Sequence, residues 1–148
     1  PVVSLCDTPG FMVGPDSEAE GAAIKMADLF SAGANLRSPL VCIFLRKAYG
    51  LGAMAMAGSS FVKPVYSAAW PMGEFGGMGL EGAVKLGYKK ELAELEGEAR
   101  EALFNSLVAK MYESGRAAEA AAFLEIDAVI DPSATRSVIL NSLRFADS

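Results

Sequence analysis

The feature that most constrains the fold of this chain is the unbroken apolar run at residues 40–45, which leads directly into the glycine-rich stretch at residues 46–61. A short run without polar alternation is typical of a strand buried on both faces of a parallel sheet. A similar run at residues 2–6 predicts an earlier strand, and the segment between the two has helical spacing. A strand, a helix and a strand within about 45 residues predict a β-α-β unit.

The connecting helix carries a start signal and an apolar face. The S-x-x-E spacing from Ser17 to Glu20 is typical of a capping box, in which the two side chains satisfy free backbone N–H groups. The face expected to point toward the sheet contains Ala23, Ala27, Phe30 and Ala34.

The rest of the chain continues the alternation of strands and helices. Further strands are expected at residues 65–69 and 128–130, and helices at residues 51–57, 80–86, 89–113, 117–123 and 134–145. Gly97 is expected to kink or split the longest of these helices. The pattern therefore predicts an α/β fold.

Composition excludes several classes of function. The 148 residues contain no His, which excludes a Ser-His-Asp triad and a His-ligated zinc site, and we expect no metal. The net charge of −5 without a Lys/Arg stripe argues against nucleic acid, and the longest uncharged apolar stretch, about 12 residues, is too short to cross a membrane. Cys6 and Cys42 lie in apolar runs and are expected to be buried reduced thiols, which fits a cytoplasmic protein.

The opening of the chain, PVVSLCD, already lies inside a strand-like run. We therefore expect the sequence to be a fragment of a longer protein. Its 52% hydrophobic content and mean hydropathy of +0.30 predict a surface that associates with other subunits.

The segment Gly50-Leu51-Gly52 follows the central strand and has two interpretations. A strand that turns sharply into a helix leaves the first backbone N–H groups of the helix unpaired. Two such groups aimed at one point form an oxyanion hole, which requires no reactive side chain. The alternative is a tight turn whose small residues serve helix packing.

Other segments also leave two alternatives. The loop at residues 75–79 is either a flexible ligand loop or a close-packed turn. Arg46 and Lys47, just after the central strand, either hold an anion or form a salt bridge at the end of the sheet. Four methionines either line an adaptable pocket or fill the core: Met54, Met56, Met72 and Met78.

Several short motifs occur in order and together resemble one protein family. They are Asp7-Thr8-Pro9-Gly10-Phe11, Arg46-Lys47-Ala48-Tyr49-Gly50, Ala69-Trp70-Pro71, Met78-Gly79, Glu81-Gly82-Ala83-Val84, and residues 126–132 with Thr135-Arg136. The chain resembles the carboxyltransferase (β) subunit of biotin-dependent acyl-CoA carboxylases of the propionyl-CoA and acetyl-CoA carboxylase type. Each motif is weak alone, and the specificity comes from their order along nearly the whole chain.

The resemblance implies a ClpP/crotonase-like fold with repeated β-β-α units. It also implies that residues 1–148 are part of a single C-terminal carboxyltransferase domain, lacking the N-terminal domain and the start of its own. The implied reaction is carboxyl transfer from carboxybiotin to the α-carbon of an acyl-CoA, with this chain supplying the biotin side of the active site.

The same resemblance implies partners. Biotin would arrive on a separate biotin carboxylase or biotin carboxyl carrier subunit, because the chain has no biotinyl-lysine motif. The active site would form between copies of the chain, in a dimer or a trimer of dimers. The fragment alone is expected to be inactive.

The resemblance also assigns site residues. The backbone N–H groups of Leu51 and Gly52 would form the oxyanion hole for biotin, and Ala53 and Met54 would belong to the acyl pocket. The residues that would bind biotin are Tyr49, Gly50, Gly10 and Phe11. Met54 stands where propionyl-type members usually have Asp, which hints at a longer or bulkier acyl group.

Three alternatives remain beside this interpretation. A biotin-dependent decarboxylase of the same family would run the transfer in reverse, and a non-catalytic scaffold with the same fold would use the glycines only for packing. A crotonase-like hydratase is the third, although the sequence offers no suitable pair of acidic residues for it.

Overall fold

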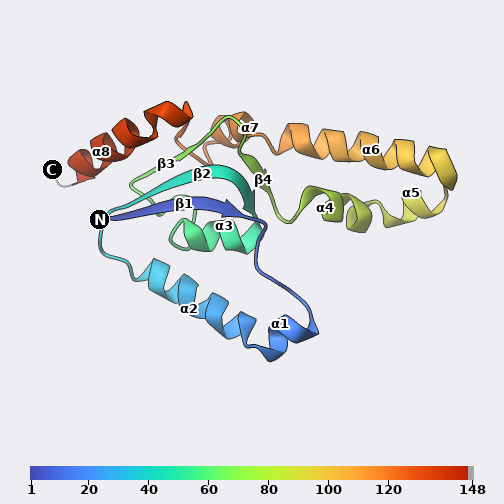
Figure 1. Ribbon diagram of the computed structural model, residues 1–148, viewed down its shortest axis with the longest axis horizontal. Coiled ribbons are helices and arrows are strands. Elements are labelled where there is room, and N and C mark those ends of the chain that lie inside the picture. The colour runs from blue at the N-terminus through green and yellow to red at the C-terminus, as the bar shows by residue number, and fades with distance from the viewer. Residues whose placement is uncertain (147–148) are drawn as a thin grey trace.

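The computed structural model describes residues 1–146 and consists of a parallel sheet with helices on both faces (Figure 1). The strands are β1 (Val2–Thr8), β2 (Leu40–Tyr49), β3 (Tyr66–Ala69), β4 (Glu74–Gly76) and β5 (Ala128–Val129). The helices are α1 (Pro15–Ala19), α2 (Ala22–Ala34), α3 (Gly50–Met56), α4 (Leu80–Gly87), α5 (Lys89–Ala93), α6 (Gly97–Ser114), α7 (Ala117–Ala122) and α8 (Thr135–Ala146), with a 3-10 turn at Pro132–Ala134. Residues 147–148 of the expected single domain lie outside the described residues.

Strand β2 is the centre of the sheet. The strand order is β1-β2-β3-β5, and β4 pairs with β2 beyond the end of β3. All of these pairings are parallel, which confirms the parallel sheet predicted from the apolar run. β2 extends four residues past the predicted end, because residues 47–49 pair with β4 and Ala48 pairs with Thr8.

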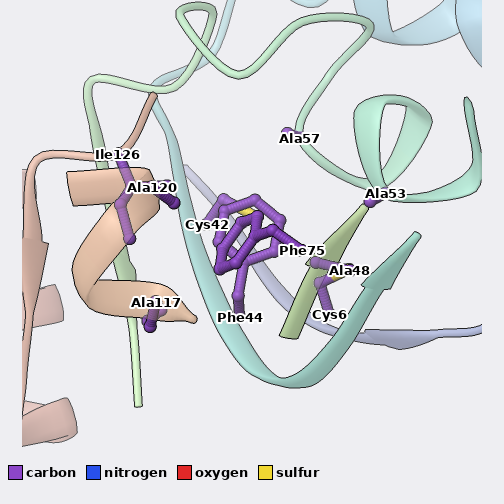
Figure 2. Packing of buried hydrophobic residues seen from close by; sticks show 11 residues of the cluster. Cys6, Cys42, Phe44, Ala48, Ala53, Ala57, Phe75, Ala117, Ala120 and Ile126 are labelled. Carbon is purple, nitrogen blue, oxygen red and sulfur yellow. The ribbon is translucent and has the colours of Figure 1, made fainter. Parts of the chain in front are cut away.

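Both faces of β2 are buried, as predicted. Cys42 and Phe44 point into a cluster that includes Phe75 and residues of α3 and α7 (Figure 2). Val41 and Ile43 point to the opposite face, where α8 covers them. The two cysteines are fully buried and form no disulfide, which confirms the expectation of buried reduced thiols.

The start and the apolar face of α2 differ from the predictions. Ser17 lies inside α1, and α2 begins after Gly21, whose φ of 78° allows the chain to turn between the two helices. The prediction of a capping box at the start of α2 is therefore wrong. The half-buried positions of α2 are Ala22, Met26, Phe30 and Gly33, a face shifted from the predicted alanines. On this face Gly33 meets the segment after α3, at Gly58 and Ser59.

Residues 80–114 form an arm. Helices α4, α5 and α6 extend away from the sheet, and α4 packs along α6 (Figure 1). The predicted break at Gly97 is confirmed, since α5 ends at Ala93 and Gly97 starts α6 with a φ of 53°. None of the described helices is long and apolar enough to cross a membrane.

The close contact of α2 with the segment after α3 gives a testable prediction. A Cβ at Gly33 would lie 2.8 Å from the carbonyl carbon of Gly58, whereas a Cβ at Gly87 would meet nothing within 4 Å. We expect Gly33→Ala to destabilise the domain by about 1–3 kcal/mol through overpacking. Gly87→Ala should be neutral or slightly stabilising, because alanine favours helix.

The measurement is amide hydrogen exchange of peptides from α2 and α3 in the full-length protein. Gly33→Ala should accelerate exchange there and Gly87→Ala should not. Equal protection in both variants would contradict the packing described here.

Candidate functional site

Three glycine-containing loops meet at the C-terminal end of β2. Gly50 starts α3 with a φ of 56°, and a Cβ there would lie 2.6 Å from the carbonyl oxygen of Gly77. A Cβ at Gly52 would lie 2.9 Å from the Cα of Gly10. The loops after β1, β2 and β4 therefore touch backbone to backbone, and any larger side chain at Gly50 or Gly52 would separate them.

The predicted biotin and oxyanion residues lie around this meeting point. The start of α3 has the extended Tyr49 as its N-cap and no side chain that caps it. The first N–H groups of a helix have no acceptor within the helix. Leu51 is 52% exposed, while Gly52 is buried against Gly10 and the backbone nitrogen of Phe11. An anion or polarised oxygen at the surface beside Leu51 can be met by backbone donors without any reactive side chain.

Tyr49 is held by a residue that the sequence analysis missed. Its hydroxyl donates a 2.6 Å hydrogen bond to Oε2 of Glu74 in β4, and the residue as a whole is buried. Burial first, and then the Glu74 carboxylate, raise the pKa of Tyr49 above its ordinary value. Because β4 has only three residues and was predicted as a loop, no periodic signal in the sequence pointed to Glu74.

An ion pair fixes the loop after β1. Nη2 of Arg46 lies 3.2 Å from Oδ2 of Asp7, and the backbone N–H of Lys47 donates to Oδ1 of Asp7 at 3.0 Å. The hydrogen bond from Lys47 is the main cause of the lowered pKa of Asp7, and Arg46 adds to it. The salt-bridge alternative for Arg46 is thereby confirmed. The contact ties the segment that leads to Gly10 to the end of β2.

The first part of the loop predicted at residues 75–79 is instead part of strand β4 (Glu74–Gly76), because its backbone pairs with the end of β2. Phe75 is 7% exposed and pairs with Ala48 inside the sheet. Gly77 and Gly79 have open space where a side chain would be.

A cavity of about 690 Å³ adjoins the start of α3. Its lining includes Leu51, Met54 and Met78 together with residues of α4, α6 and α7. Met54 and Met78 therefore agree with the pocket alternative, and Met56 agrees with the core alternative because it packs against the core cluster. Met72 is exposed and agrees with neither. Ala53, predicted for the acyl pocket, is fully buried in the core cluster beneath the turn.

The fold that carries the glycine-lined site is shared with known carboxyltransferase domains. The solved structures that this chain resembles are carboxyltransferase domains of the crotonase/ClpP-like fold, which confirms the predicted fold class. A structure of a single-chain, multi-domain long-chain acyl-CoA carboxylase matches with a TM-score of 0.83 and 54% identity, over 95% of this chain and 14% of that one. The transcarboxylase 12S structure with methylmalonyl-CoA and methylmalonic acid bound matches with a TM-score of 0.86 and 30% identity, over 97% of this chain and 27% of that one.

The sequence comparisons identify the family. The model of the carboxyl transferase domain matches residues 1–148, so the chain belongs to the carboxyl transferase domain family. The propionyl-CoA carboxylase beta chain of Saccharopolyspora erythraea is 37% identical over 148 residues, which cover 97% of this chain. The chain spans 27% of the length of that relative. The family predicted from the ordered motifs is therefore confirmed.

The Tyr49–Glu74 contact predicts a dependence of stability on alkaline pH. The pKa of Tyr49 is raised on folding, so this group stabilises the fold fully below about pH 10, the ordinary range of tyrosine. The stabilisation is lost as the pH rises through the higher pKa of the folded state. We expect Tyr49→Phe to lower the free energy of unfolding by roughly 1.5–3 kcal/mol at pH 7 and to remove this dependence.

The matched control is Tyr112→Phe. The Tyr112 hydroxyl makes a longer, exposed hydrogen bond of 3.4 Å to Glu81. The measurement is the unfolding midpoint of each full-length variant from pH 7 to pH 11. Tyr49→Phe should lower the midpoint at pH 7 more than Tyr112→Phe does. Equal behaviour of the two would show that the buried contact does not set the stability of this end of the sheet.

Proposed function

We propose that this chain is part of the C-terminal domain of an acyl-CoA carboxylase carboxyltransferase and forms the biotin side of its active site. The observation that carries the proposal is the meeting of Gly10, Gly50 and Gly77 around the start of α3, in a chain whose whole length matches the carboxyl transferase domain. The reaction is carboxyl transfer from carboxybiotin to the α-carbon of an acyl-CoA.

The residues present fit a biotin ring at this point. Gly10 and Gly52 keep the backbone close and free of side chains, and Phe11 offers a half-buried aromatic ring beside it. Carboxybiotin, when bound, supplies the activated carboxyl group. The N–H groups of Leu51 and Gly52 would stabilise negative charge on an oxygen of the bound ring, in the manner of an oxyanion hole.

The proposal includes partners that complete the site. Biotin comes on a carrier domain or subunit, and the acyl-CoA thioester is held by a part of the protein outside this chain. Further copies of the chain are expected around the site, in a dimer or trimer of dimers. The two buried thiols, Cys6 and Cys42, favour a cytoplasmic location.

A proline substitution tests the backbone donor directly. Leu51 lies in the first turn of α3, where proline is tolerated, and its side chain is half exposed. Leu51→Pro removes the N–H donor, and Leu51→Ala removes the side chain but keeps the donor. We expect Leu51→Pro to lower kcat about 10²–10³-fold and Leu51→Ala to have a much smaller effect.

The measurement is carboxyl transfer between free biotin and malonyl-CoA or methylmalonyl-CoA by the full-length protein. Hydrogen exchange of the sheet peptides verifies that each variant is folded. A folded Leu51→Pro variant as active as Leu51→Ala would contradict the proposed oxyanion hole. The glycine turn would then serve only packing.

A further inference from the structure

The cavity beside the start of α3 is much larger than a short acyl group requires. Its volume of about 690 Å³ lies within the roughly 300–1,000 Å³ of pockets that hold drug-sized ligands. A methylene group occupies about as much volume as a water molecule, roughly 30 Å³. An acetyl or propionyl group would therefore leave most of the cavity unfilled.

Most of the residues that line the cavity are apolar. The floor consists of Phe75 and Leu80, which are 7% and 4% exposed, and of the half-buried Phe61. Toward solvent lie Leu51 and Phe123, which are 52% and 77% exposed. Such a lining favours a ligand with apolar surface along its whole length, because each buried methylene leaves water.

The polar groups of the lining argue against a charged or hydrogen-bonding occupant. Among the described residues that line the cavity, the charged ones are Glu119 and Glu125, both acidic and exposed. They would repel the phosphates of CoA or a free carboxylate. The Ser114 hydroxyl already bonds to carbonyl oxygens of its own helix. A biotin ring inside the cavity would leave its polar edge without side-chain partners.

The cavity is continuous with the proposed site. Leu51, whose N–H group we assign to the oxyanion hole, is part of its lining, and so is Met54, one turn further along α3. An acyl chain whose α-carbon lies near this turn can extend into the cavity, while its CoA remains outside.

We propose that this cavity binds the alkyl tail of a long-chain acyl-CoA, and that this chain thereby selects the acyl length. The proposal rests on the carboxyltransferase function above. It assigns the selection of length to the walls formed by β4, α4, α6 and α7.

The first test is a substrate series on the full-length protein with its biotin carrier. We expect kcat/KM to rise from acetyl- and propionyl-CoA through octanoyl-CoA to dodecanoyl- and palmitoyl-CoA, each used below its micelle concentration. A preference for acetyl- or propionyl-CoA would overturn the proposal.

The second test narrows the cavity from two sides. Ser114→Phe and Ala83→Phe place a ring at an exposed and a half-buried lining position, on α6 and α4. Ala102→Phe puts the same ring on the exposed surface of α6, outside the cavity lining, and is the matched control. The lining variants should lower the ratio of palmitoyl- to propionyl-CoA kcat/KM by at least about tenfold, since displacing two buried methylenes suffices for that. A ratio unchanged from the control in both folded variants would overturn the proposal.

Calorimetric binding separates failure of the pocket from failure of the proposed reaction. Binding of dodecanoyl-CoA should weaken in Ser114→Phe relative to Ala102→Phe, while binding of CoA itself stays equal. Weakened binding without carboxylation of any acyl-CoA would reject the reaction and keep the pocket. Active enzyme with unchanged dodecanoyl-CoA binding would reject the pocket and keep the reaction.

Discussion

The structure depends first on the pairing of β2 with three other strands. The backbone groups of a buried strand must find hydrogen-bond partners, and β2 finds them in β1 on one side and in β3 and β4 on the other. Because β3 pairs only with residues 41–44, the last residues of β2 are left for β4. This arrangement carries the chain to Tyr49 in an extended conformation, and the turn into α3 follows at the edge where the loops after β1 and β4 also arrive.

The core and the proposed acyl cavity share the same aromatic residues. Phe44 packs edge-on against Phe61 and Phe75, with ring centroids 5.4 Å and 5.1 Å apart. Phe44 and Phe75 lie in the core cluster and Phe61 packs against it, while Phe61 and Phe75 also line the cavity. The cavity floor is therefore packed directly against the core on β2. Its width depends more on the α4–α6 arm, which packs on itself rather than across the sheet (Figure 1).

Two polar contacts hold the loops that flank the turn. The Asp7–Arg46 pair and the Lys47 N–H bond fix the segment after β1, and the Tyr49–Glu74 bond fixes β4. The first contact is exposed and contributes mainly orientation, since exposed ion pairs stabilise little. The second is buried on the tyrosine side, where an unmade hydrogen bond would be costly. The two contacts lie on the segments that lead to Gly10 and Gly77, the glycines that meet the start of α3.

The sequence alone determined the parallel sheet, the family and most elements, because the apolar run at residues 40–45 and the ordered motifs are local signals. Breaks such as Gly97 were also predictable, since a glycine inside a helical pattern weakens the helix. Only the tertiary structure decided the face of α2, the existence of β4 and the partner of Tyr49. Gly33 faces the segment after α3 because a glycine permits close backbone contact, and β4 exists because β2 offers it unpaired groups. The cavity is likewise a tertiary feature, because its lining residues are spread from Ala48 to Glu125 and only the fold brings them together.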